Sequence, residues 1–191
     1  LGCFAYIVSS RSTEAKTKQA GIDTLAQMGA KLRFIVKDVE NMSIYLIGQP
    51  DIQQLLRAPD DDTQERTRLL GMMSNLVYSK SYISSISIYP INGAPVMSTA
   101  SIYSSELELD LFQMKDKVWT GLYEIENYAG KRKVLSFIRP LRSVNDYQAL
   151  GWLVISLDEE IVSRNWTEPR LNAGQGQVAL LNERHEIVSA T

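Results

Sequence analysis

Hydrophobic residues recur at helical spacing over a long stretch near the start of the chain, from Gly21 to Ile47. The pattern predicts an amphipathic helix whose apolar side is broad enough to cover a sheet and also to meet a partner helix. We expect this helix to occupy residues 11–47 as a spine, and to stop at Gly48-Gln-Pro50 because proline disfavours helical geometry in the residue before it. Two apolar rows form that side: Ile22, Leu25, Leu32, Val36, Val39 and Leu46, and beside them Met28, Ile35 and Met42.

Two shorter helices are predicted next. Asp51 can cap a helix over residues 52–58, and Asp62 with Glu65 fits the capping-box spacing of a helix that runs to about Lys80. From Ser81 the pattern changes to a period of two, which predicts strands. Residues 83–89 form the first strand, and Asn92-Gly93 marks a hairpin turn. Residues 94–99 follow as an edge strand, because Pro95 cannot donate a ladder hydrogen bond.

A capping-box pattern at Ser105 predicts a helix that buries Leu107, Leu111 and Met114, although its LELDL core could also alternate as a strand. Three further strand candidates follow, joined by turn-forming stretches that favour an antiparallel meander. The expected fold class is therefore α+β, with a long N-terminal helix beside a five-stranded antiparallel sheet. The three candidates are Val118–Glu126, Lys131–Arg142 and Leu150–Asp158.

The last part of the chain predicts a short helix from Asp158 to Trp166 and then a hairpin over residues 177–191. A lone hairpin is marginal in water, so we interpret it as the first part of a second module. The expected organisation is residues 48–158 as one domain and residues 159–191 as a linker helix with the opening hairpin of the second module.

Residues 1–10 begin with an apolar run, LGCFAYIV, that is too short to span a membrane by itself. One interpretation is the outer end of a transmembrane helix, with Tyr6 at the interface. Another is a signal-peptide remnant in which Cys3 carries a lipid. The apolar residues after Cys3 favour the transmembrane end.

Composition narrows the chemistry. The net charge of −2 and the lack of a basic stripe argue against nucleic acid as a partner. A single cysteine, Cys3, permits no internal disulfide. A single histidine, His185, excludes metal sites built on several histidines, and no cofactor or metal is expected. Acidic pairs such as Glu124/Glu126 are interpreted as solvated surface groups, and we expect no enzyme activity from this chain.

The order of elements resembles the extracytoplasmic sensor region of bacterial membrane histidine kinases of the YesM type, which carry a double Cache domain. The resemblance spans most of the chain. It lies in NMSIYLIGQPDIQQLL, SYISSISIYPINGAPVMST, KVLSFIRPL, LGWLVISLDEEIV and QVALLNERHEIVSAT. His185 stands where the family usually has glycine in a turn, and the family's amino-acid signature is absent because Thr120 follows Trp119.

The resemblance implies a PAS-like five-stranded sheet outside the cell membrane, anchored by membrane helices, with the start of a second Cache module. It implies a two-component signal receptor in which this region senses while cytoplasmic kinase regions catalyse. It also implies a ligand pocket on one sheet face, roofed by residues 98–118. The lining residues on this basis are Tyr103, Trp119, Tyr123, Ser136 and Arg139, although strand alternation places Ser136 and Arg139 on opposite faces.

Two functions stay open at this stage. The first is direct binding of a small molecule, with a saccharide indicated by the family's association with carbohydrate uptake. The second is recognition of a solute-binding or cell-surface protein by a module without a small ligand. A polar cavity would favour the first function, and a sheet face packed with Ile and Leu would favour the second. In both cases the broad apolar side of the spine helix predicts a homodimer in the full receptor.

Overall fold

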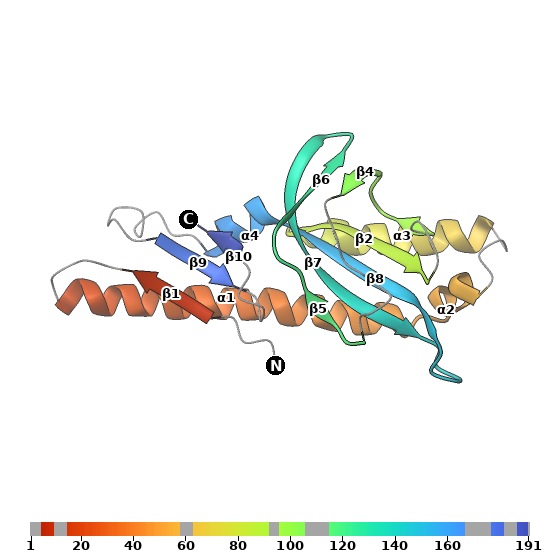
Figure 1. The fold of residues 1–191 in the computed structure, drawn as a ribbon, viewed down its shortest axis with the longest axis horizontal. Helices are drawn as coiled ribbons and strands as arrows, with labels where there is room; N and C mark the ends of the chain where they lie inside the picture. Colours follow the sequence, from red (N-terminus) through yellow and green to blue (C-terminus); the bar gives the residue numbers. More distant parts are fainter. Residues whose placement is uncertain are drawn as a thin grey trace.

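A long helix runs along the molecule and a seven-stranded antiparallel sheet packs across it (Figure 1). The computed structural model describes residues 5–9, 15–57, 63–91, 96–105, 115–166, 177–181 and 187–190. In chain order the elements are β1 (Ala5–Ser9), α1 (Ala15–Ile47), α2 (Pro50–Arg57), α3 (Thr63–Ser79), β2 (Ile83–Pro90), β3 (Met97–Ser98), β4 (Ile102–Ser105), β5 (Val118–Trp119), β6 (Tyr123–Asn127), β7 (Gly130–Arg142), β8 (Ala149–Asp158), α4 (Glu159–Trp166), β9 (Gln177–Leu181) and β10 (Ile187–Ala190).

The predicted spine helix is confirmed as α1, whose 33 residues span about 50 Å. Its buried side follows alternating steps of four and three residues: Met28, Leu32, Ile35, Val39, Met42 and Leu46. Ile22, which the hydrophobic pattern placed on the same side, is 49% exposed. The buried face therefore combines Leu32, Val39 and Leu46 of the first row with the methionine row.

Helices α2 and α3 lie close to the predicted ranges. α2 begins at Pro50, so Asp51 lies in its first turn rather than before it. Proline is well suited to a first helical position, where its missing N–H would have no intrahelical partner. The two helices bury Ile52, Leu55, Leu69 and Met73 in the same core as α1.

The predicted meander is confirmed, because β6, β7 and β8 are consecutive neighbours in the strand order β3-β2-β8-β7-β6-β4. β3 is at an edge, as Pro95 predicted. The sheet has seven strands rather than the predicted five. One additional strand is β4, and the other arises because the predicted strand Val118–Glu126 is split into β5 and β6. The predicted helix after Ser105 falls on residues 106–114, which lie outside the described part of the chain, as does the Asn92-Gly93 turn.

The split between β5 and β6 is a one-residue bulge. Trp119 is paired with Phe137, and Tyr123 is paired with Val134. Three residues, 120–122, therefore stand opposite two, 135–136, on β7. An extra residue in one strand reverses the faces to which later side chains point.

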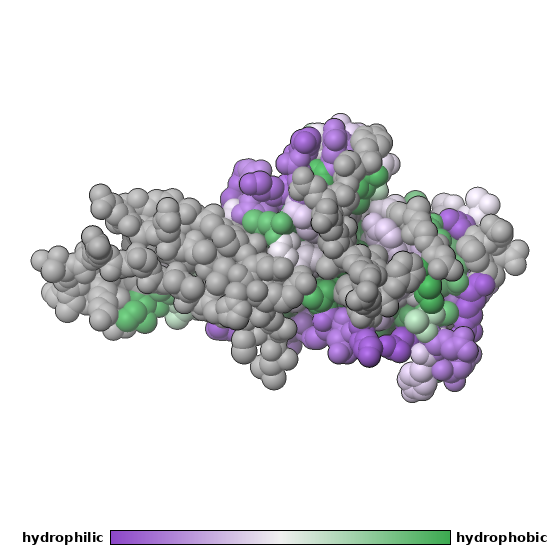
Figure 2. Space-filling model, viewed as in Figure 1, coloured by the Kyte–Doolittle hydropathy of each residue, from purple (hydrophilic) through white to green (hydrophobic). Residues whose placement is uncertain are grey.

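The main core lies between the helices and one face of the sheet. Leu135, Phe137 and Leu141 of β7 belong to the same buried cluster as the apolar side of α1. Leu153, Ile155 and Leu157 of β8 continue it. Because side chains alternate along a strand, the intervening residues of β7 and β8 point to the other face. At the β6–β7 turn hydrophilic residues dominate the surface (Figure 2).

The ends of the chain meet in a smaller sheet of order β1-β9-β10. Residues 5–9 are thus a strand, not the end of a helix as we expected. Ala5 pairs with Leu181 and Ser9 with Gln177 across this sheet. The predicted hairpin is confirmed by β9 and β10, whereas its turn, with His185, lies outside the described residues. Within the described ranges, the structure contains no helix with the length and hydropathy of a membrane span.

Candidate ligand-binding site

The sheet face opposite α1 carries a row of hydroxyl groups, and we call this side the hydroxyl face. Its serines are Ser85 and Ser87 on β2, Ser136 on β7 and Ser156 on β8, and all four are buried. The register explains why they meet: Ser85 is paired with Ser156, which is paired in turn with Ser136. Side chains paired across antiparallel strands share a face and lie close together.

Tyr123 completes a connected cluster of hydroxyls. Its Oη lies 2.6 Å from Ser136 Oγ, which lies 2.8 Å from Ser156 Oγ. The backbone holds this arrangement, because the Ser136 N–H donates to Thr120 Oγ1 at 2.8 Å and the Thr120 N–H donates to the Ser136 carbonyl at 2.9 Å. The last two contacts fix the bulge directly behind the cluster.

The electrostatics keep this cluster neutral. Burial raises the pKa of Tyr123, while hydrogen bonds from Ser136 and Ser156 act in the opposite direction. Burial also raises the pKa of Tyr89 on β2, and its proximity to Tyr123 adds to the shift. Two protonated phenols therefore lie close together on the hydroxyl face. Each can donate as well as accept a hydrogen bond.

Ser85 and Ser87 extend the polar surface toward β3. Ser87 Oγ is 2.8 Å from Ser98 Oγ, and Ser98 donates to the carbonyl of Ala100 at 2.8 Å. Ser85 Oγ is fully buried and has no hydrogen-bond partner among the residues that the structure describes. A buried hydroxyl without a partner is unfavourable, so this atom is a candidate contact for a bound molecule.

The other end of the hydroxyl face is apolar and aromatic. Ile138, Trp152 and Val154 form a small buried cluster there. Tyr89, Ile91 and Val118 pack against it. The face thus offers an apolar surface directly beside a group of hydroxyls, which is the combination typical of small-molecule sites.

An ion pair lies at the end of β8 on the same face. Arg132 Nη1 is 3.2 Å from Asp158 Oδ2. Asp158 is paired in the ladder with Val134, which is also paired with Tyr123. Asp158 therefore lies two residues along the strand from Ser156, on the same face. The charged groups here compensate each other. In the described part of the chain there is no cluster of three acidic, histidine or cysteine side chains that could hold a metal ion.

The five residues predicted from the sequence separate into two sets. Tyr123 and Ser136 meet on the hydroxyl face. Trp119 and Arg139 lie on the opposite face, around Phe137: the Trp119 and Phe137 ring centroids are 5.0 Å apart, and Arg139 Cζ is 5.4 Å from the Phe137 centroid. Tyr103 belongs to β4, and its side chain is outside the described set.

Arg139 is placed between the sheet and the spine helix. Burial lowers the pKa of Arg139, while the nearby carboxylate of Glu40 on α1 acts in the opposite direction. Glu40 also pairs with Lys117 at 2.7 Å, immediately before β5. These basic groups therefore face α1, on the side of the sheet away from Ser136.

Sequence reasoning missed Tyr89, Ser87, Ser156, Arg132 and Asp158. The alternating patterns SSISIY and ISLD did place serines on one side of each strand. Only the strand order and register of the structure show that those sides form one surface.

No protein-family model matches the chain, and no curated protein matches it. Solved structures do. The extracellular domain of the putative histidine kinase vpHK1S-Z8 is 18% identical with a TM-score of 0.65, over 82% of this chain and 62% of that one. A domain of a putative sensory box/GGDEF family protein from Vibrio parahaemolyticus gives the same identity and TM-score over 81% and 65%.

A chemoreceptor domain shares the architecture too. The ligand-binding domain of the Pseudomonas aeruginosa amino acid chemoreceptor PctC, solved with GABA, is 13% identical with a TM-score of 0.57, covering 93% of this chain and 74% of that one. The fold is therefore the PAS-like Cache fold that is found in extracellular domains of histidine kinases and in ligand-binding domains of chemoreceptors. This chain spans less than two thirds of the first two domains, 62% and 65% of their lengths.

Proposed function

We propose that the chain is the extracytoplasmic signal-sensing domain of a membrane-anchored histidine kinase, and that it binds a small polar molecule on its hydroxyl face. The observation that carries this proposal is the buried cluster of Tyr123, Ser136 and Ser156. A sheet face that served only as core would favour aliphatic side chains, as the face toward α1 does, because burying hydroxyls stabilises less than burying hydrocarbon.

The chemistry of the face favours a neutral ligand rich in hydroxyls, and a saccharide is the class we propose. Serine and tyrosine hydroxyls both donate and accept, which suits the hydroxyl groups of a sugar. The apolar region around Trp152 and Tyr89 suits the C–H face of a sugar ring. Tyr123 and Ser136 are the predicted ligand residues that we retain, and Tyr103 stays a prediction. Trp119 and Arg139 are assigned to packing against α1.

A second function has a specific observation in its favour. The PctC domain was solved with GABA, so an amino acid is the natural competitor to a saccharide on this fold. Such a ligand has one charge of each sign and would engage Arg132 and Asp158 rather than the neutral hydroxyls. Recognition of a solute-binding or cell-surface protein would instead leave the hydroxyl face unused.

We also propose that α1 pairs with its counterpart in a homodimer of the full receptor. The broad apolar side from which this pairing was predicted is buried in the core. The proposal therefore rests on Phe34, Ile44 and Tyr45 of α1, which are 64%, 54% and 52% exposed. Exposed apolar side chains along one helix favour helix–helix contact. Sedimentation of the receptor with its membrane helices restored, in micelles, tests this. A monomer at high concentration would contradict it.

A thermal-shift screen tests the ligand proposal. The 191-residue chain is melted with mono- and oligosaccharides, amino acids and organic acids in turn. A ligand at a hundred times its Kd that binds the folded state alone adds about 2.7 kcal/mol of stability. A saccharide hit that Tyr123→Phe weakens, and that Tyr128→Phe at an exposed turn position does not, supports the proposal. If only amino acids stabilise the chain, an amino acid replaces the saccharide as the proposed ligand. If no compound stabilises it, recognition of a protein partner becomes the favoured function.

A further inference from the structure

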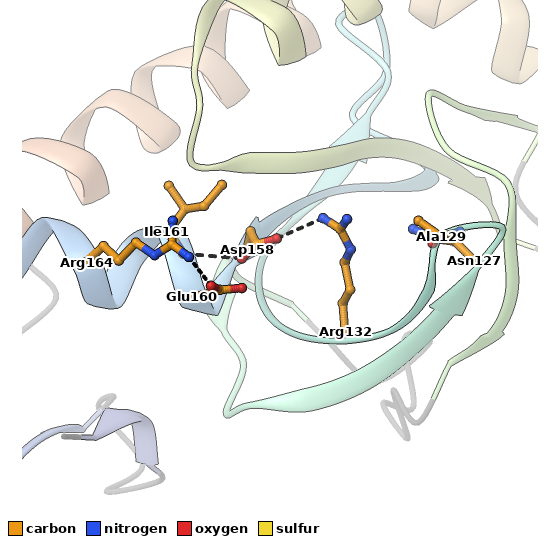
Figure 3. A network of polar contacts seen from close by, with 7 residues as sticks. All are labelled: Asn127, Ala129, Arg132, Asp158, Glu160, Ile161 and Arg164. Atoms are coloured by element: carbon orange, nitrogen blue, oxygen red, sulfur yellow. Dashed lines mark hydrogen bonds and ion pairs between the residues drawn. The ribbon is translucent and has the colours of Figure 1, made fainter.

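Asp158, the last residue of β8, connects the hydroxyl face to helix α4. Its Oδ2 pairs with Arg132 Nη1 at 3.2 Å, and its Oδ1 accepts the backbone N–H of Ile161 at 3.2 Å (Figure 3). Ile161 is the third residue of α4, so this second contact is an N-cap. A single carboxylate therefore contacts the hydroxyl face with one oxygen and begins the next helix with the other.

The backbone of Asp158 reaches toward the spine helix. Its N–H donates to the carbonyl of Tyr82 at 3.1 Å. The hydroxyl of Tyr82 donates to the carboxylate of Asp38 on α1, and Lys80 pairs with the same carboxylate at 3.0 Å. α4 itself contacts α1 and β10, and its Val162 is buried in the main core.

The two partners of the ion pair differ in accessibility. The Asp158 side chain is 11% exposed, whereas the Arg132 side chain is 48% exposed. Arg132 is therefore the partner that a dissolved anion or a ligand acceptor can reach. Without Arg132, the nearly buried Asp158 carboxylate would lose its cationic partner while it lies directly before Glu159 and Glu160. Rotation of that carboxylate toward water would then remove the acceptor from the Ile161 N–H.

We propose that the Arg132–Asp158 ion pair holds the α4 cap in place, so that a ligand group that draws Arg132 away from Asp158 loosens α4. α4 contacts β7 and β8 of the seven-stranded sheet, β10 of the smaller sheet, and α1. A change in its first turn can therefore alter the packing of α1 and of β10. A ligand acts on this network only if the hydroxyl face binds one, as proposed above. The network itself can be tested without a ligand.

Hydrogen exchange of the α4 amides in the 191-residue chain tests the proposal. In Arg132→Gln, exchange in the first turns of α4 is expected to rise about fivefold, the effect typical of a lost N-cap. Lys131→Gln is the matched control, because it removes a neighbouring positive charge whose partner at 2.8 Å is Glu124. Equal α4 exchange in the two variants would overturn the proposal. Arg132 is half exposed, so its replacement leaves the core packing intact.

Substitutions at Asp158 separate the cap from the ion pair. Asp158→Asn keeps an oxygen that can cap α4 but loses the charge, and it is expected to raise α4 exchange as Arg132→Gln does. Asp158→Ala removes both contacts and should raise it further. If Asp158→Asn keeps wild-type protection in α4, the ion pair does not hold the cap.

The dependence of α4 exchange on salt concentration tests the ion pair, because apolar packing alone would not produce it. The half-exposed pair is screened as ionic strength rises to about 1 M. α4 exchange should therefore increase with salt in the wild type and stay constant in Arg132→Gln. Equal salt dependence in both would count against the pair. If no ligand stabilises the chain but these exchange effects are present, the proposed ligand binding is wrong and the link between the ion pair and α4 holds. If a ligand stabilises the chain but the exchange effects are absent, the link is wrong and the ligand binding holds.

Discussion

Trp119 and Tyr123 lie four residues apart in the chain and on opposite faces of the sheet. In a regular strand, residues four apart point the same way. Here the bulge at residues 120–122 reverses the alternation, so Trp119 packs on Phe137 beside α1 while Tyr123 joins Ser136 on the hydroxyl face. The bulge thus separates a core aromatic from a candidate ligand residue.

Conservative substitutions at these two positions should differ in their effect on ligand affinity. Trp119→Phe is expected to lower the free energy of unfolding by about 1–3 kcal/mol, because it shrinks a side chain in the main core. Affinity for a ligand found by the screen should stay unchanged. Tyr123→Phe should cost about 1 kcal/mol through its lost hydrogen bond and should weaken the ligand by tenfold or more. Urea unfolding and calorimetric titration measure the two quantities, and a loss of affinity in Trp119→Phe would contradict the assignment of faces.

Gly151 is expected to tolerate no side chain. A Cβ at this position would lie 2.0 Å from the carbonyl oxygen of Tyr89 and 3.0 Å from the Cα of Pro90, on the neighbouring strand. Gly151→Ala must push β2 and β8 apart, and we expect a loss of about 3 kcal/mol or more. Gly71→Ala is the control, because a Cβ there meets nothing within 4 Å. Since Gly71 lies inside α3, alanine should stabilise by about 0.5–1 kcal/mol. Thermal melts that rank the two variants the other way would refute the β2–β8 packing.

Gln53 should stabilise the β7–β8 hairpin from helix α2. Its amide nitrogen donates to the carbonyl of Arg142 at 2.9 Å, and its oxygen accepts the N–H of Val144 at 3.4 Å. Gln53→Ala removes both hydrogen bonds of a buried side chain and should cost about 1 kcal/mol. The neighbouring Gln54 is exposed, so Gln54→Ala should change stability by less than about 0.5 kcal/mol. Similar unfolding midpoints for both variants would show that the two Gln53 hydrogen bonds contribute little to stability.

Stability should fall in alkaline solution because of Tyr82. Burial and the hydrogen bond to Asp38 raise the pKa of Tyr82 above its ordinary value of 10.0. The folded chain therefore keeps the phenolic proton above pH 10, whereas the unfolded chain releases it. The contribution of this group is complete below pH 10 and is lost as pH rises from there, by at most about 1.4 kcal/mol per pH unit. Burial raises the pKa of Tyr89 and Tyr123 in the same direction.

The check is urea unfolding from pH 8 to pH 11 in the wild type and in Tyr82→Phe. The variant should be less stable at pH 8, because the contact with Asp38 is lost, and its stability should decline less steeply above pH 10. Tyr78→Phe serves as the control, since Tyr78 is 88% exposed and should keep the wild-type pH profile. Parallel curves for the wild type and Tyr82→Phe would mean that Tyr82 does not retain its proton.

Local patterns were enough for the helices and most strands. The buried positions of α1 follow directly from its spacing of three and four residues, and the Pro50 stop follows from the chemistry of proline. The order of β6, β7 and β8 followed from the short turns between them. Ala5–Ser9 was assigned to a helix because an apolar run of this length has no clear period, and pairing with Gln177–Leu181 made it a strand.

The candidate site needed tertiary information. Tyr123 and Ser136 were in the predicted set because polar and aromatic side chains on strands are plausible ligand contacts. Trp119 was predicted beside Tyr123 because the family resemblance placed the pocket lining there, and the bulge that separates them has no distinctive pattern in VWTGLYE beyond a central glycine. Asp158 was predicted at the start of α4, but its pairing with Arg132 arises from the register of β7 against β8.

The sequence by itself determined the α+β class, the spine helix, the antiparallel meander and the serine-bearing side of each strand, because hydrophobic period and turn chemistry act over a few residues. The tertiary structure decided which of those sides became one surface. Strand order, register and a single bulged residue set which side chains meet across the sheet, and these depend on contacts between residues far apart in the chain.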